Sequence, residues 1–162
     1  MAYVEGRTVH DADSHVVETP DWLFPYADAA LRTRMRPLYV SKVRPGEENA
    51  IDAIRRRRAD PADRPRAEAE LMQRKNWDAL GSFINEDRPR ALDLLGFASQ
   101  MVFNTFATAY LLQVELGDDL DLAYGIARAH NRAIVDFCAA DRRLIAVGYV
   151  PLADFERSRA IP

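Results

Sequence analysis

Three short segments and one long amphipathic segment dominate the pattern of hydrophobic positions along the chain. The first short segment has valines on both sides of alternating small and polar residues, and the other two are apolar runs. The three short segments predict β-strands at about residues 7–17, 99–104 and 144–150. The last run, LIAVGYV, is continuously apolar, which is typical of a parallel strand covered on both faces. A helix is expected over residues 119–139, where apolar positions recur at helical spacing: Leu120, Ala123, Ala127, Ile134 and Phe137. This alternation of strand and helix predicts an α/β fold with a parallel sheet.

A long helical insertion, residues 19–95, separates the first two predicted strands. Thr19 and Pro20 supply an N-cap and a first-turn proline, so a helical turn is expected there. Further helices are expected at residues 27–34, 47–58, 66–80 and 88–95, with an extended piece at residues 38–43. Gly96 is expected to close the last helix, because glycine tolerates the left-handed conformation of a helix C-cap.

Length and composition fit one globular domain. The chain has 162 residues, of which 48% are hydrophobic and 29% charged. A formal net charge of −3 gives no general attraction to nucleic acid or to anionic membranes. No apolar stretch reaches membrane-spanning length, and the first 20 residues contain no uninterrupted apolar stretch, so that no secretory signal is expected. The single cysteine, Cys138, excludes an intrachain disulfide and fits a cytoplasmic protein; it is expected to act as a small buried hydrophobe.

The most informative polar cluster, DADSH, stands at the end of the first predicted strand. Because residues two apart on a strand point to the same side, Asp11, Asp13 and His15 are expected to share one face, with His10 on the other. Carboxylate oxygens and imidazole nitrogens bind divalent cations such as zinc. Since parallel α/β folds place their sites at strand ends, the cluster predicts a metal site; the alternative is a cluster that only caps a turn. For Glu18, just beyond it, two roles are open: a partner that supports the metal ligands, or an exposed residue before Thr19 and Pro20, which is the expectation.

Three segments of the chain resemble the amidohydrolase-related metal-dependent hydrolases, within them the branch similar to aminocarboxymuconate-semialdehyde decarboxylase. HDADSHVVETPDWL resembles the first-strand signature of that family. NWDALGSFINEDRPRALDLLGFASQMVFNTF and AHNRAIVDFCAADRRLIAVGYVPLAD resemble the segments around its second and third strands. The resemblance implies the N-terminal part of a TIM (β/α)8 barrel, about three βα units with a long insertion after the first strand.

The same resemblance implies the chemistry. It assigns Asp13 and His15 as ligands of a divalent metal, zinc or alternatively manganese, in a hydrolase or decarboxylase of small carboxylate- or aromatic-type substrates. Trp22 and Asn104 are candidates for the mouth of the substrate site, although family members often have proline at the position of Asn104. The family's later histidine ligands and its catalytic aspartate have no counterpart here. The chain is therefore expected to be incomplete and inactive alone, and to need another copy or a complementing chain.

Two other functions fit the same sequence. One is a non-catalytic remnant, and the other is an interaction module that associates through the open edge of its sheet. The arginine run at residues 55–58 is expected to be a solvated helix end rather than a contact for phosphate or carboxylate.

Overall fold

The computed structural model describes residues 2–38 and 47–161, and it contains a three-stranded parallel sheet in the order β1-β2-β3. The strands are β1 (His10–His15), β2 (Ser99–Phe103) and β3 (Leu144–Ala146). β1 pairs with β2 and β2 with β3, each in parallel. The predicted α/β class, the parallel sheet and the places of the three strands are thus confirmed.

Two strands end earlier than predicted because their backbone groups find partners outside the sheet. After β1, the Val17 N–H donates to the carbonyl of Ser82 at 2.8 Å. After β3, the side chain of Asn131 holds Tyr149: its Oδ1 accepts from the Tyr149 N–H at 2.7 Å, and its Nδ2 donates to the Tyr149 carbonyl at 3.1 Å. The second half of the apolar run LIAVGYV therefore leaves the sheet.

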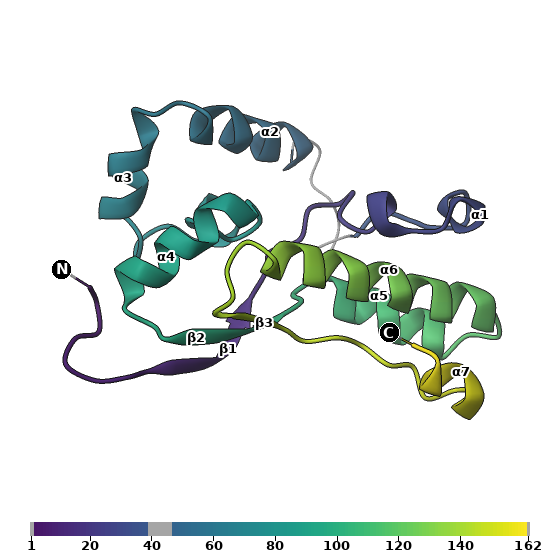
Figure 1. Cartoon of the computed structure of the whole chain (residues 1–162). Helices are drawn as coiled ribbons and strands as arrows, with labels where there is room; N and C mark the ends of the chain where they lie inside the picture. Colours follow the sequence, from purple (N-terminus) through teal and green to yellow (C-terminus); the bar gives the residue numbers. More distant parts are fainter. Residues whose placement is uncertain (1, 39–46, 162) are drawn as a thin grey trace.

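Helices cover one side of this sheet (Figure 1). The helices of the described residues, of which α6 packs directly on the strands, are α1 (Ala29–Arg32), α2 (Glu47–Arg58), α3 (Asp63–Ala69), α4 (Arg88–Leu95), α5 (Ala107–Glu115), α6 (Leu120–Cys138) and α7 (Phe155–Arg159). Short 3₁₀ turns lie at Phe24–Tyr26, Asn76–Asp78 and Asn85–Asp87. In the described part of the chain, none of these helices combines the length and the apolar character needed to cross a membrane.

Helix α6 is the central element, and it matches the predicted helix closely. Its first turn is capped by Asp119, whose carboxylate accepts from the Leu122 N–H at 3.1 Å. Ile134 and Phe137 pack between the sheet and α4. Further toward its N-terminus, the buried face of α6 packs with α5 and with the segment around Leu31. One helix therefore joins two hydrophobic clusters.

Helix α5 was not predicted. Its sequence, ATAYLLQVE, is apolar without a clear polar face, and the residue at its N-cap position, Phe106, has no side-chain capping bond. The cap comes from Glu18, 87 to 89 positions earlier in the chain, whose carboxylate accepts from backbone N–H groups at the start of α5. A helix signal supplied from so far away does not appear in a local pattern.

The insertion between β1 and β2 contains shorter helices than the sequence predicts. The expected helix at residues 47–58 is confirmed as α2, whereas the helix expected at residues 27–34 shrinks to α1. The helix expected at residues 66–80 is wrong beyond α3, because Asn76 has a positive φ of 53° that an α-helix does not allow. Apart from Leu38, the extended piece expected at residues 38–43 lies outside the described residues.

The helix expected at residues 88–95 is confirmed as α4, and Gly96 ends it. Gly96 has a left-handed φ of 77°, and its N–H donates to the Leu92 carbonyl at 2.9 Å. A Cβ at this position would lie 2.3 Å from the carbonyl oxygen of Val4. Glycine is therefore required both by the backbone conformation and by the close approach of the N-terminal segment.

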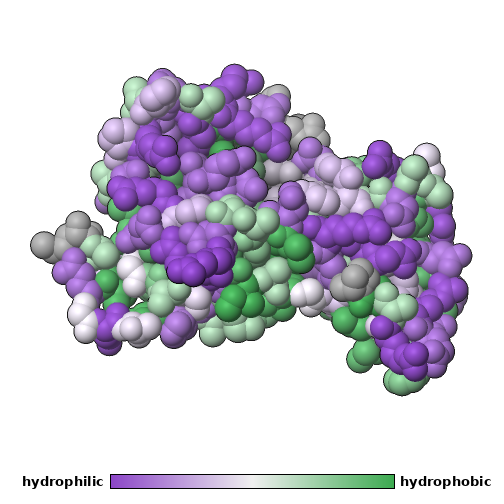
Figure 2. Space-filling view, in the orientation of Figure 1, coloured by the Kyte–Doolittle hydropathy of each residue, from purple (hydrophilic) through white to green (hydrophobic). Residues whose placement is uncertain are grey.

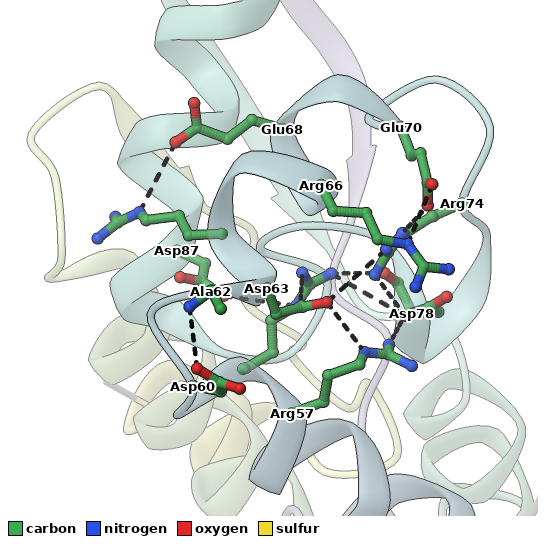
Figure 3. A network of polar contacts seen from close by, with 12 residues as sticks. Arg57, Asp60, Ala62, Asp63, Arg66, Glu68, Glu70, Arg74, Asp78 and Asp87 are labelled. Atoms are coloured by element: carbon green, nitrogen blue, oxygen red, sulfur yellow. Dashed lines mark hydrogen bonds and ion pairs between the residues drawn. The ribbon is translucent and has the colours of Figure 1, made fainter.

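An ion-pair network joins α2, α3 and the turn at Asn76–Asp78 (Figure 3). Arg58 and Asp63 are buried, with side chains 6% and 5% exposed, and Arg58 Nη1 donates to Asp63 Oδ2 at 2.8 Å. Arg57 and Arg74 both donate to Asp78. The expectation that the arginine run is a solvated helix end is thus wrong for Arg58, which turns inward because Asp63 offers a buried counter-charge.

The opposite face of the sheet carries no helix or strand of the described residues (Figure 1). Met101 and Ile145 are paired neighbours on β2 and β3, and they are 39% and 49% exposed. Figure 2 shows hydrophobic residues gathered over the strands in the lower middle of the view, whereas the region of α2 and α3 at the top is mostly hydrophilic. The sheet therefore presents an open apolar face.

Candidate metal centre

Strand β1 has a bulge where the DADSH cluster lies. Asp11 pairs with Gln100, but Ser14 pairs with Val102, so β1 has one residue more than β2 in this interval. Asp13 lies within the bulge, where its N–H donates to Asp11 Oδ1 at 3.1 Å. A bulge of this kind interrupts the alternation of side chains between the two faces of a strand.

The bulge places Asp11 on the helix-covered face, away from His15. Asp11 is in register with Gln100, which is buried beneath α4, and Asp11 Oδ2 accepts from Gln100 Nε2 at 3.0 Å. The predicted common face of Asp11, Asp13 and His15 is therefore wrong for Asp11, because the rule of alternation holds only along an unbroken strand.

The two histidines of β1 lie on the same face, contrary to the prediction. His10 pairs with Ser99 and His15 with Phe103, and these partners are four residues apart on the regular strand β2. His10 lies at the other end of the strand, where its Nδ1 is 2.7 Å from Ser99 Oγ. The extra residue in the bulge is what reverses the expected placement of His10.

Asp13 and His15 come together at the carboxyl end of β1. Asp13 Oδ1 lies 3.3 Å from His15 Nε2, and the two side chains are 91% and 46% exposed. The other ring nitrogen, Nδ1, lies 2.8 Å from the backbone carbonyl oxygen of Asn104. Because a carbonyl oxygen can only accept, Nδ1 must carry a proton.

This hydrogen bond decides what Nε2 of His15 can do. In a neutral imidazole with a proton on Nδ1, the lone pair is on Nε2, which here points at the carboxylate of Asp13. Both His15 Nε2 and Asp13 Oδ1 would then be hydrogen-bond acceptors. They repel each other at 3.3 Å unless a proton or a metal cation lies between them. Histidines that bind metals are commonly oriented by an Nδ1–H bond to a carbonyl of this kind, so the donor set and its orientation fit a divalent metal.

Of the two substrate-mouth candidates, the structure places Asn104 beside His15. Its backbone carbonyl orients the imidazole, while its side-chain Oδ1 accepts from Thr108 Oγ1 at 2.6 Å in the first turn of α5. Trp22 lies elsewhere: its ring packs against Phe137 of α6, with centroids 5.8 Å apart.

Glu18 has a structural role that its expected exposure did not suggest. It is only 1% exposed, where the sequence suggested an exposed side chain. Its carboxylate accepts from the backbone N–H groups of Thr105, Phe106 and Ala107 at 2.9 to 3.2 Å. Burial raises the pKa of Glu18, and these N–H bonds partly oppose that rise. Glu18 thus fixes the segment after β2, including Asn104, relative to the end of β1.

Arg88 is the second residue that was missed. It is 7% exposed, and burial lowers its pKa. Arg88 Nε donates to Gln100 Oε1 at 3.1 Å, and Nη1 donates to the carbonyl oxygens of His15 and Gly81 at 3.2 and 3.0 Å. Nη2 donates to Ser14 Oγ. The only sequence signal is its place at the start of the predicted helix, which gives no hint of burial.

Asp13 and His15 are two ligands, fewer than the three that a catalytic zinc site takes from protein. Within residues 2–38 and 47–161, no group of three or more His, Cys, Asp or Glu side chains is placed to hold a metal. The pair borders a cleft of about 370 Å³, which is also lined by Asp11 from its helix-covered side, by Arg88 and Gln100, and by apolar residues such as Leu80. Further ligands would have to come from water, substrate or another chain segment.

The remaining histidine and the cysteine are buried away from this centre. His130 on α6 is 1% exposed, and burial lowers its pKa to about 4. Cys138, at the end of α6, is buried, and burial raises its pKa to about 11. The thiol is therefore protonated near neutral pH, in line with its predicted role as a small buried hydrophobe.

Comparison with known proteins adds no assignment: no protein-family model matches the chain, and no curated protein matches it.

Proposed function

We propose that the chain contributes the first βα units of an amidohydrolase-related (β/α)8 barrel, whose activity is metal-dependent hydrolysis or decarboxylation of a small carboxylate- or aromatic-type substrate. The fold is compatible with this role, because it has three parallel strands in sequential order with helices on one face. In a barrel of this class, the other face would be covered by the remaining strands. Those strands would belong to another segment or to a complementing chain.

The observation that carries the proposal is the geometry of Asp13 and His15. The Asn104 carbonyl keeps the proton of His15 on Nδ1, and Nε2 lies 3.3 Å from the Asp13 carboxylate at the carboxyl end of a parallel strand. Parallel α/β enzymes place their catalytic groups at this end. Asp13 and His15 would hold zinc or manganese, and Asn104 is proposed to border the substrate, whereas Trp22 packs against Phe137 away from this site.

The chemistry follows from that assignment. A bound divalent metal lowers the pKa of its water toward neutrality or polarises a substrate oxygen. The residues of this chain have the complementary task of holding the ion and fixing its direction of approach. Asp13 supplies charge, and His15 supplies a neutral nitrogen whose orientation is set by Asn104.

Metal binding tests the proposal directly. The purified protein is loaded with zinc, desalted and analysed for metal content per chain, and His15→Ala and Asp13→Ala are treated in parallel. Both variants are expected to lose most of the bound zinc. His10→Ala is the matched control, because His10 lies on the same face of β1 but at the other end, and it should bind as the wild type does. Equal zinc in all four proteins would contradict the ligand assignment.

Association through the sheet is a second candidate function. It is favoured by the open apolar face at Met101 and Ile145, and by the position of β1 and β3 at the two edges of the sheet. In this case the chain would be an interaction module, and Asp13 and His15 would only shape the end of β1. Sedimentation at increasing protein concentration, without metal, would detect it.

A further inference from the structure

We propose that Arg88 and Gln100 are positioning residues for the candidate metal ligands: they hold the β1 bulge from both sides and thereby keep Asp13 beside His15. The inference rests on the proposed function, because it assigns a purpose to the Asp13–His15 geometry. Neither residue contacts Asp13 or the imidazole of His15, so both would act through Asp11, Ser14 and the His15 carbonyl on the flanks of the bulge.

The first step is that the bulge needs support. An extra residue in a strand is left out of the ladder, and the local pairing is weakened. In β1 that residue is inside the interval that holds Asp13, between the paired positions Asp11 and Ser14. If the bulge relaxed into a regular strand, the register of β1 would change and the side chains would change faces.

The second step is that one polar network forms hydrogen bonds to both flanks of the bulge. On the N-terminal flank, Asp11 Oδ2 accepts from Gln100 Nε2 at 3.0 Å. On the C-terminal flank, Arg88 donates to Ser14 Oγ and to the His15 carbonyl oxygen. The two halves are joined where Arg88 Nε donates to Gln100 Oε1 at 3.1 Å. The amide of Gln100 has one orientation that satisfies both neighbours, because its nitrogen donates to Asp11 and its oxygen accepts from Arg88.

The third step concerns the burial of Arg88. The acceptors that its guanidinium meets among the described residues are all uncharged, and a carboxylate is reached only through Gln100. A buried charge without a direct counter-ion is a poor source of stability, whereas it specifies one arrangement of the acceptors around it. Two of those acceptors, Ser14 Oγ and the His15 carbonyl oxygen, lie on the C-terminal flank of the bulge.

Gly81 completes this arrangement. Its carbonyl oxygen accepts from Arg88 at 3.0 Å, and its φ is +71°. A Cβ at Gly81 would lie 2.7 Å from Arg88 Cα. Only glycine at position 81 lets the backbone of the insertion approach the start of α4 so closely. This close approach makes the Gly81 carbonyl the fourth acceptor around the Arg88 guanidinium.

The test uses two substitutions that leave the interior polar. Arg88→Lys is too short to reach all four acceptors. Gln100→Glu keeps an oxygen for Arg88 but offers only acceptors to Asp11, so that the N-terminal flank loses its bond. Arg90→Lys is the matched control on α4, because Arg90 pairs with Glu68 outside the network. Far-UV circular dichroism confirms that each variant is folded, and Gln100→Glu decides the outcome should Arg88→Lys not fold.

Two readouts separate positioning from general stability. In the metal-free protein at fixed pH, the imidazole ¹⁵N chemical shifts of His15 are expected to move in both variants, while those of His10 stay constant. Cobalt(II), titrated spectroscopically, is expected to bind the variants about tenfold more weakly than the wild type, in the range found for residues that orient metal ligands. Arg90→Lys should match the wild type in both measurements.

The outcomes distinguish this inference from the proposed function. Unchanged His15 shifts and unchanged cobalt affinity in folded variants would overturn the positioning role, while cobalt binding by the wild type would still support the metal site. A wild-type protein that binds no cobalt, but whose His15 shifts respond to both substitutions, would overturn the proposed function and retain the positioning role. If the wild type binds no cobalt and the His15 shifts are unchanged in both variants, the proposed function and the positioning role are both overturned.

Discussion

At the scale of single residues, three buried titratable side chains, Glu18, Arg88 and His130, stand out in this structure. Glu18 holds the start of α5 through backbone N–H groups, and Arg88 holds the end of β1 through backbone and side-chain oxygens. His130 differs from both, because its buried Nδ1 has no hydrogen-bond partner among the described residues. Each group was placed by contacts with residues far away in the sequence, and each couples the fold to pH or to substitution.

His130 is expected to make the protein less stable as the pH falls. Its pKa is about 4 in the fold against an ordinary value of 6.5, so the unfolded chain binds more protons between these limits. The stabilising contribution is complete above pH 6.5 and is lost as the pH decreases toward 4, by about 3 kcal/mol. Urea denaturation at several pH values measures it.

The matched comparison isolates His130 from other titrating groups. His130→Gln is expected to flatten the pH dependence between 6.5 and 4, whereas His10→Gln, at an exposed histidine, should keep the slope of the wild type. Glu18, whose raised pKa acts with the opposite sign, is present in all three proteins and cancels in the comparison. A slope unchanged by His130→Gln would show that another group is responsible.

At the scale of elements, the insertion is held together by charge rather than by a large apolar core. The small cluster formed by Ala67, Leu80 and Ala91 joins α3 to α4. Beside it, the network of Figure 3 links α2, α3 and the turn at Asn76–Asp78. Arg90 and Glu68 add an ion pair between α3 and α4. Such buried charges require every partner, because removal of one leaves another without compensation.

Arg58→Met is therefore expected to destabilise the insertion. The substitution leaves the buried Asp63 without its closest guanidinium, and breaking a buried pair in this way costs about 3 to 5 kcal/mol. Arg56→Met is the control, because Arg56 is exposed on the same helix. Native-state hydrogen exchange should show faster exchange in α3 for Arg58→Met and little change for Arg56→Met. Equal protection in the two variants would mean that Arg57 and Arg74 suffice for Asp63.

At the scale of the whole molecule, the sheet is covered on one face and open on the other. Leu92, Val102, Ile134 and Leu144 fill the covered side. The open side exposes Met101 on the central strand β2 and Ile145 on β3, and among the described residues β1 and β3 are the edge strands. An exposed apolar face beside free strand edges favours contact with further β-structure, either of the same barrel or of another molecule.

Ile145→Glu tests the importance of that face. A charged side chain on the open face of the edge strand β3 is expected to lower the associated fraction in sedimentation experiments several-fold, since an unpaired carboxylate resists burial. Val135→Glu is the control, because Val135 is an equally exposed apolar residue on α6. Similar effects of the two substitutions would indicate general solubility rather than docking through the sheet.

Local patterns were sufficient for those elements whose signals lie within them. The helix at residues 119–139 has both its apolar stripe and its capping Asp119 in the local sequence, and it is present as α6. Gly96 likewise ends α4 as expected, because a left-handed C-cap is a local requirement. Helix α5 was missed because its cap, Glu18, is supplied by a distant segment.

The sequence by itself determined the α/β class, the parallel sheet and the motif that brings Asp13 and His15 to the end of β1. Only the tertiary structure decided on which face of the sheet the side chains of β1 lie. The bulge in β1 is flanked by contacts with Gln100 and Arg88, and it leaves Asp11 on the face opposite to His15 and His10 on the same face as His15. Alternation along a strand is a local rule, whereas a bulge depends on what packs against the strand, and no local pattern contains that information.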